Sequence, residues 1–203
     1  MSATKAQPLK PRVRQRFNQK GVASVEFAFV ALLFFTVVFG IIEFARAMYM
    51  YNTMAEVTRS AAHAAANISF NDADALNLAR KRAVLDEENG NLPFGSPITY
   101  QNVRIDYLYL PANGLALQRI APGSMPSCPA RNRVNCMNDP NSASCIRAVQ
   151  ARICQEGANA GTCTAVSYQP LISLVSLRLK LPIALTIASA ESLGYRAGDI
   201  PCP

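Results

Sequence analysis

Six cysteines are the residues whose type and spacing most clearly suggest chemistry. Their number is even, and five of them follow one another at gaps of eight or nine residues. Zinc sites usually combine closely spaced cysteine pairs with nearby histidines, and the only histidine here is the distant His63. The pattern therefore favours disulfides formed in an oxidising compartment, with the pairing left open, among Cys128, Cys136, Cys145, Cys154, Cys163 and Cys202.

Motifs for catalysis or cofactor binding are not found. The sequence contains no phosphate-binding glycine loop, no dinucleotide fingerprint, no His-Glu-x-x-His zinc motif and no Gly-x-Ser-x-Gly elbow. A Ser-His-Asp or Cys-His site would have to recruit His63 from an alanine-rich stretch, where a packing or surface role is favoured. We therefore expect no catalytic residues, no cofactor and no metal site.

The positive charge is concentrated at the front of the chain. The net charge is +7, and the first 20 residues hold six cations and no acid: Lys5, Lys10, Arg12, Arg14, Arg16 and Lys20. The rest is nearly neutral, and its one dense basic cluster, Arg80-Lys81-Arg82, is followed by the acids Asp86-Glu87-Glu88. Because a nucleic-acid surface needs a basic stripe on the folded part, we do not expect a nucleic-acid partner.

An apolar run that could contact the lipid bilayer follows this basic leader. Residues 27–42 carry no charge and are preceded by the apolar residues 22–25, with Glu26 between them. The uncharged run covers about 24 Å as a helix, a little short of a bilayer core of about 30 Å unless the flanks contribute. A carboxylate at the edge of such a span is a functional candidate. Cations before the span predict a cytoplasmic N-terminus and an outer C-terminal domain.

A cleaved secretory signal peptide is the main alternative for this segment. Its ingredients, a basic region and an apolar region, are both present, and Ala45 and Ala47 could mimic a cleavage site. Three features oppose it: the apolar run is somewhat long, Glu26 interrupts its start, and the helical pattern continues beyond it. We therefore expect that this helix is not removed as a secretory signal peptide, with cleavage near residue 48 as the alternative.

The helical pattern extends well past the apolar run. Polar residues from Asn52 to Asn67 recur every three or four positions, and apolar residues from Phe44 to Ala65 do likewise on another face. No proline occurs between Val22 and Asn67. The sequence therefore predicts one continuous helix over residues 22–66.

The remainder predicts a small mixed domain. N-cap candidates near Asp72 and a stop at Asn89-Gly90 predict a second helix over 72–88. Alternation over 102–110 predicts a strand, and similar patterns predict further antiparallel strands at 165–168, 177–181 and 183–187. We expect a long loop over 111–141. A short helix between Cys145 and Cys154 would turn these two cysteines to opposite faces, so that each pairs elsewhere. The fold class is therefore α+β, with the sheet packed on the projecting helix.

The segment Gly21-Val22-Ala-Ser-Val-Glu26-Phe27, followed at once by the apolar helix, resembles the processing site of type IV prepilins. Reading on through Gly40-Ile-Ile-Glu43-Phe44-Ala-Arg46-Ala-Met-Tyr49-Met-Tyr51-Asn52, the chain resembles the TadE-like pseudopilins, or minor pilins, of tight-adherence (Tad) pilus systems. The resemblance is close over residues 20–66. It is looser beyond, where Val166-Ser-Tyr168-Gln-Pro170-Leu171 and Leu185-Thr-Ile-Ala-Ser-Ala190-Glu191 are similar to the family's C-terminal region.

This resemblance implies roles for four residues. Prepilin peptidase would cut after Gly21, leave Val22 as the mature N-terminus, and remove the leader 1–21. Glu26, with Phe27 beside it, would then serve assembly by attracting the N-terminal amine of a neighbouring subunit, a pair that lipid would strengthen. The helix 22–66 and an outer domain 67–203, with a cysteine-rich section 128–163, would remain.

The implied function is a non-enzymatic subunit of an adhesive pilus at the bacterial inner membrane. Its partners would be prepilin peptidase, other pilins or pseudopilins, and the Tad assembly platform. Whether the subunit enters the filament is left open by the sequence. An alternative from another class is a periplasmic binding module or enzyme held by a passive anchor.

Overall fold

The computed structural model describes residues 20–157, 162–172, 179–200 and 202. The predicted leader, residues 1–21, therefore lies almost entirely outside the described part. By its internal contacts the chain divides into two units, Met1–Phe39 and Gly40–Pro203.

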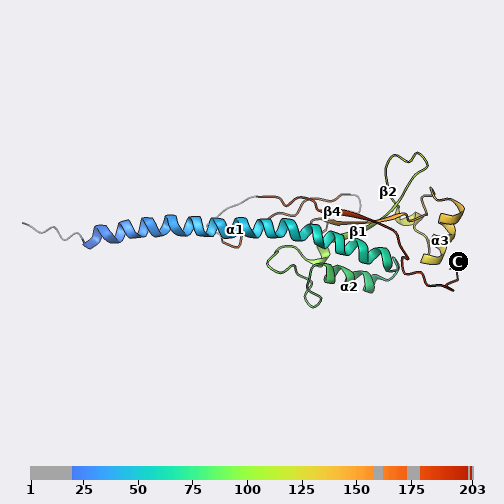
Figure 1. Cartoon of the computed structure of the whole chain (residues 1–203), viewed down its shortest axis with the longest axis horizontal. Coiled ribbons are helices and arrows are strands. Elements are labelled where there is room, and N and C mark those ends of the chain that lie inside the picture. Colours follow the sequence, from blue (N-terminus) through green and yellow to red (C-terminus); the bar gives the residue numbers. More distant parts are fainter. Residues whose placement is uncertain (1–19, 158–161, 173–178, 201, 203) are drawn as a thin grey trace, which may run out of the picture. The chain divides into compact units, whose positions relative to one another are not determined.

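One helix, α1, runs from Lys20 to Asn67 and confirms the predicted continuous helix (Figure 1). In the first unit its side chains are mostly exposed, including the apolar ones such as Phe27, Phe29 and Leu33. By length and composition, the helix over Gly21–Asn67 is long and apolar enough to cross a membrane. An exposed apolar surface of this extent is unfavourable in water, because apolar area removed from water is worth about 25 cal/mol per Å².

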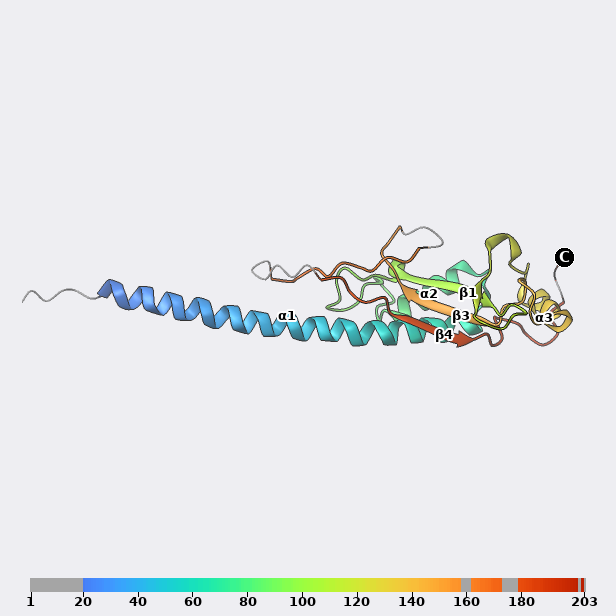
Figure 2. The same cartoon turned by 90° about the horizontal axis from the view of Figure 1, so that it is seen from above.

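In the second unit, α1 forms one side of the core. Met50, Met54, Val57 and Ala61 recur every three or four residues and are almost completely buried. This is the spacing at which side chains share one face of a helix. Against this face packs a sheet of four antiparallel strands in the order β2-β1-β3-β4: β1 Val103–Tyr109, β2 Gln118–Arg119, β3 Ala148–Ile153 and β4 Leu185–Ser189 (Figure 2). The α+β class is confirmed.

The second helix, α2, spans Ala73–Ala83. Its N-cap is Asp72, one of the predicted candidates, and the carboxylate accepts a hydrogen bond of 2.9 Å from the Ala75 N–H. The helix ends five residues before the predicted end at residue 88. Leu85 adopts a positive φ of 65°, and a left-handed residue cannot continue a right-handed helix.

Two other local predictions are wrong. The segment between Cys145 and Cys154 is not a helix but the strand β3, where Val149, Ala151 and Ile153 alternate toward the core and pair with β1 and β4. The predicted loop 111–141 contains β2, a 3₁₀ turn and the helix α3, Pro129–Asn138, which begins with a proline at a position where its missing N–H costs nothing.

The strand predictions have mixed outcomes. The strand predicted over 102–110 is confirmed as β1, and the one predicted over 183–187 appears as β4, two residues further on. Residues 165–168 contribute only an isolated bridge from Ser167 to Lys180. Part of the predicted strand 177–181, Leu177 and Arg178, lies outside the described residues.

All six cysteines form disulfides: Cys128–Cys202, Cys136–Cys145 and Cys154–Cys163. Cys145 and Cys154 thus pair with other cysteines, as predicted, although a strand rather than a helix separates them. The first bridge joins the start of α3 to the chain's C-terminal end, and the second joins α3 to the segment before β3. The third bridge joins the residue after β3 to the segment that follows it.

Candidate functional site

The four residues singled out by the sequence lie on the first two turns of α1. Gly21, Val22, Glu26 and Phe27 are all helical and exposed. A Cβ added to Gly21 would meet no atom within 4 Å, so packing inside the described chain does not require a glycine there. The structure therefore leaves these residues accessible to a partner, and their processing and assembly roles stay predictions.

A second constellation, which the sequence reasoning did not select as a site, surrounds Glu43. The Glu43 side chain is completely buried although it follows directly on the apolar run. Its Oε2 accepts a hydrogen bond of 2.5 Å from the Tyr168 hydroxyl, and its Oε1 accepts the backbone N–H groups of Leu171 and Ile172 at 2.7 and 2.8 Å. Three donors thus replace the water that this carboxylate loses, which is what burial of a charge requires.

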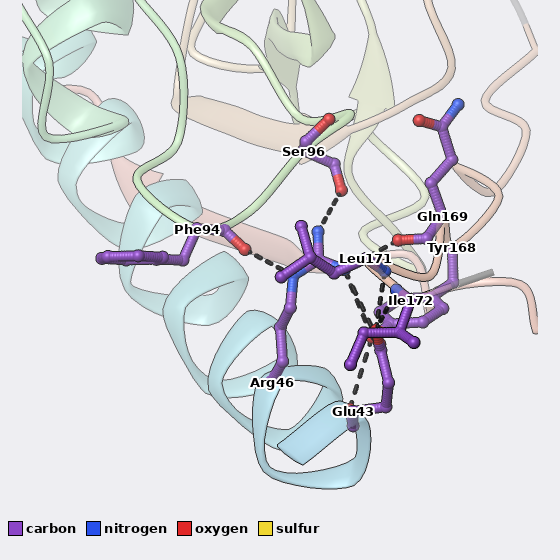
Figure 3. A network of polar contacts seen from close by, with 8 residues as sticks. All are labelled: Glu43, Arg46, Phe94, Ser96, Tyr168, Gln169, Leu171 and Ile172. Atoms are coloured by element: carbon purple, nitrogen blue, oxygen red, sulfur yellow. Dashed lines mark hydrogen bonds and ion pairs between the residues drawn. The ribbon is translucent and has the colours of Figure 1, made fainter. Parts of the chain in front are cut away.

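Arg46, one turn further along α1, supplies the opposite charge. Its Nη1 lies 3.8 Å from Glu43 Oε2. The guanidinium also donates to three backbone carbonyls, those of Phe94 and Ser96 at 2.8 Å each and that of Gln169 at 2.7 Å (Figure 3). The planar fork of an arginine suits such divergent acceptors, and a lysine could not satisfy them in the same geometry.

Tyr168 completes the network. Its ring lies beneath the Arg46 guanidinium, with 5.3 Å between Cζ and the ring centroid, and the side chain is buried. Burial raises the pKa of the Tyr168 hydroxyl, and the hydrogen bond to Glu43 raises this pKa further. The hydroxyl is therefore held as a donor. We call Glu43, Arg46 and Tyr168 the clamp, because together they fasten the segments 93–97 and 168–172 to α1.

The chemistry of the clamp is that of a structural joint rather than of a reactive centre. Its carboxylate, guanidinium and hydroxyl are matched to one another and to backbone groups within the unit. A sequence signal for it existed. Glu43 and Arg46 are the charges that end the apolar run, at a spacing of three residues that places them on one helix face, and Tyr168 lies in a segment already noted for its resemblance.

A different charge cluster occupies the opposite face of the sheet from α1. Asp106 on β1 is almost completely buried, and its carboxylate contacts Arg119 at 2.8 Å, Arg152 at 2.5 Å and Arg104 at 3.4 Å. The arginines come from three neighbouring strands, so the cluster joins β1, β2 and β3. This ion network links the three strands and contains more positive than negative charges.

Features typical of small-molecule chemistry are few in the described residues. A cavity of about 540 Å³, open to solvent, is lined by α3, the residues just before β3, and the end of β4 with the segment after it. Within the described ranges, no group of three His, Cys, Asp or Glu side chains is arranged to hold a metal ion. The lone histidine, His63, is exposed on α1.

Comparison with known proteins gives one result. No curated protein and no solved structure matches the chain. Residues 21–63, well under half of the chain, match the family model of TadE-like proteins. This match begins at Gly21, covers the apolar part of α1, and includes Glu43 and Arg46 of the clamp. Over residues 21–63 the chain is thus similar to TadE-like proteins, as the resemblance predicted.

Proposed function

We propose that this protein is a TadE-like minor pilin or pseudopilin, a non-enzymatic subunit that takes part in assembling or initiating an adhesive Tad pilus. The observation that carries this proposal is the coincidence of two features in one helix. The exposed apolar surface of α1 lies within the residues that match the family. Such a surface needs lipid or neighbouring apolar helices around it, and a pilin uses both in turn.

The proposed location is the bacterial inner membrane. The six cations before the apolar run favour a cytoplasmic N-terminus, and the three disulfides favour a periplasmic outer unit. The apolar part of the helix would first be surrounded by lipid. Once assembly begins, the proposed partners are other pilins or pseudopilins and the assembly platform.

Processing by prepilin peptidase is the first point to test. We expect protein purified from its native membrane to begin at Val22, as read by N-terminal sequencing and intact mass. A Gly21→Ala variant should keep its leader, because a protease that approaches the backbone closely needs the glycine there. Gly40→Ala is the matched control, since a Cβ at Gly40 also meets no atom within 4 Å. A start near residue 48 would instead identify an ordinary exported protein.

Glu26 is the second point to test. If its carboxylate attracts the N-terminal amine of a neighbouring subunit, Glu26→Gln should abolish recovery of the protein with other pilus subunits while leaving cleavage after Gly21 intact. Glu56→Gln is the control, because Glu56 is an exposed acid on the same helix, outside the apolar run. Equal recovery of both variants would remove Glu26 from the assembly role.

The alternative of a periplasmic module on a passive anchor has one observation in its favour, the open cavity of about 540 Å³ in the outer unit. Exchanging residues 22–42 for an unrelated single-pass apolar helix separates the two. A passive anchor tolerates the exchange, whereas a pilin loses assembly because its helix is the interaction surface.

A further inference from the structure

Two apolar side chains are held at the clamp although neither is buried by the fold. Phe94 is 84% exposed and Leu171 is 71% exposed. Phe94 also has a φ of 55°, a left-handed conformation that is costly for a bulky residue. Burial within the unit does not account for the position of either side chain. We call these two residues the loop tips.

The backbone around each tip is tightly defined. In the first loop, Leu92 N–H donates to Ile98 O at 3.0 Å and Gly95 N–H donates to Leu92 O at 2.9 Å. Gly95 has no room for a side chain, because an added Cβ would lie 2.3 Å from the buried Leu92. The Leu171 N–H is itself bound to Glu43. Both tips are therefore presented by ordered backbone at fixed places.

The hydrogen bonds to α1 show that each of the two segments runs along the helix toward the apolar run. Tyr49 donates to the carbonyl of Pro93, and Arg46, one turn closer to the apolar run, donates to the carbonyl of Phe94. In the second segment, the Gln169 carbonyl lies at Arg46 and the Leu171 N–H lies at Glu43, again closer to the apolar run. From Pro93 to Phe94 and from Gln169 to Leu171, the hydrogen-bonded backbone thus moves toward the end of the apolar run.

The depth of the tips follows from helix geometry. Ile42 is the last residue of the uncharged run, and Arg46 lies four residues later, about 6 Å along the axis. The polar interface of one leaflet is roughly 5–7 Å thick. The backbones of Phe94 and Leu171 are hydrogen-bonded to Arg46 and Glu43, so their side chains lie at the depth of this layer. The described segments 92–98 and 168–172 contain no charged residue, since they read Leu-Pro-Phe-Gly-Ser-Pro-Ile and Tyr-Gln-Pro-Leu-Ile.

We propose that Phe94 and Leu171 insert into the headgroup layer of the bilayer and, through the clamp, fix the height and tilt of the outer unit on the membrane. This inference rests on the proposed membrane anchoring of α1. Aromatic and apolar side chains next to an uncharged backbone segment are suited to this depth. The bilayer is the occupant because the tips are tied to the helix residues that directly follow the span.

The absence of tryptophan from the sequence allows a clean test. Single-tryptophan versions of the full chain, Phe94→Trp and Leu171→Trp, are placed in phosphatidylcholine vesicles whose lipids are either unmodified or brominated on the acyl chain close to the headgroup. Leu115→Trp is the matched control, because Leu115 is 86% exposed in the segment between β1 and β2. Phe34→Trp, at the middle of the apolar run, is measured in vesicles brominated near the end of the acyl chain and reports on the anchoring itself.

We expect bromine to quench Phe94→Trp and Leu171→Trp strongly, with emission at shorter wavelength than that of Leu115→Trp, which should not be quenched. If both tip variants behave like Leu115→Trp while Phe34→Trp is quenched, the inference is overturned and the anchor stands. If Phe34→Trp is also unquenched, membrane anchoring itself fails. Resistance to protease verifies that each variant is folded. Because Phe94 and Leu171 are in different segments, a folding failure of one variant leaves the other as a test.

Discussion

The two ends of α1 have opposite relations to the rest of the chain. Between Val22 and Val37 the apolar side chains are exposed, whereas between Met50 and Ala66 the apolar face is buried against strands and α2. Both parts are equally good helices, so helix formation does not distinguish them. The difference teaches that the first part must find its partners outside the described chain, and that the second part finds them in the outer unit.

The boundary between the two regimes is the clamp, and breaking it should have the largest effect. We expect Glu43→Ala to lower the free energy of unfolding of the outer unit by roughly 3–5 kcal/mol, because the partly buried Arg46 and three donors lose their acceptor. Urea unfolding of the full chain in mild detergent measures this. Glu56→Ala, an exposed acid on the same helix, should change it by less than about 0.5 kcal/mol. A similar loss in both variants would mean that the clamp is not a special joint.

The disulfides should contribute unequally to the free energy of unfolding. Removing Cys128–Cys202, which spans 74 positions, with paired serines should cost about 4 kcal/mol in the loop-entropy model, against about 3 kcal/mol for Cys154–Cys163, which spans nine. The same unfolding measurement under oxidising conditions compares them. An equal cost would indicate that local packing, rather than the entropy of the unfolded chain, sets the contribution of each bridge.

The buried and exposed parts of α1 should respond differently to the same kind of truncation. Met54→Ala, in the core, should destabilise the outer unit by about 3 kcal/mol, since it removes buried apolar groups and leaves a cavity. Leu33→Ala, in the apolar run, should leave this free energy unchanged within about 0.5 kcal/mol. A destabilising effect of Leu33→Ala on the outer unit would contradict the division of α1 into an exposed part and a part that packs in the outer unit.

The smallest effect concerns Tyr107 on β1, whose hydroxyl is buried and has no hydrogen-bond partner among the described residues. Burial raises the pKa of Tyr107 to about 12. Because the folded state favours the neutral phenol, its contribution to stability is present below the ordinary tyrosine pKa of about 10 and is lost as pH rises toward 12. Tyr107→Phe should match the unsubstituted protein at pH 7 within about 0.5 kcal/mol and lose less stability above pH 10, as followed by circular dichroism during an alkaline titration.

Local patterns predicted some elements well and others badly. The alternation of Val103, Ile105 and Tyr107 identified β1, and the long periodic stretch identified α1. The helix predicted before Cys154 is wrong because a short apolar run fits either a helix or a buried strand. Here the run pairs with β1 and β4 and therefore forms a strand. α3 was missed because its start lies among prolines and polar residues, and the disulfides at Cys128 and Cys136 hold it.

The sequence by itself determined the basic N-terminal segment, the apolar run, the continuity of α1, the TadE-like pattern from Gly21 onward and the use of cysteines as disulfides. Each of these depends on composition or on residues close together in the chain. Only the tertiary structure decided which cysteines pair, that residues 148–153 form a strand, and that Glu43 is buried beneath Tyr168, 125 positions away. The physical reason is that a buried charge is stable only where its partners converge, and convergence of distant segments leaves no periodic mark on the sequence.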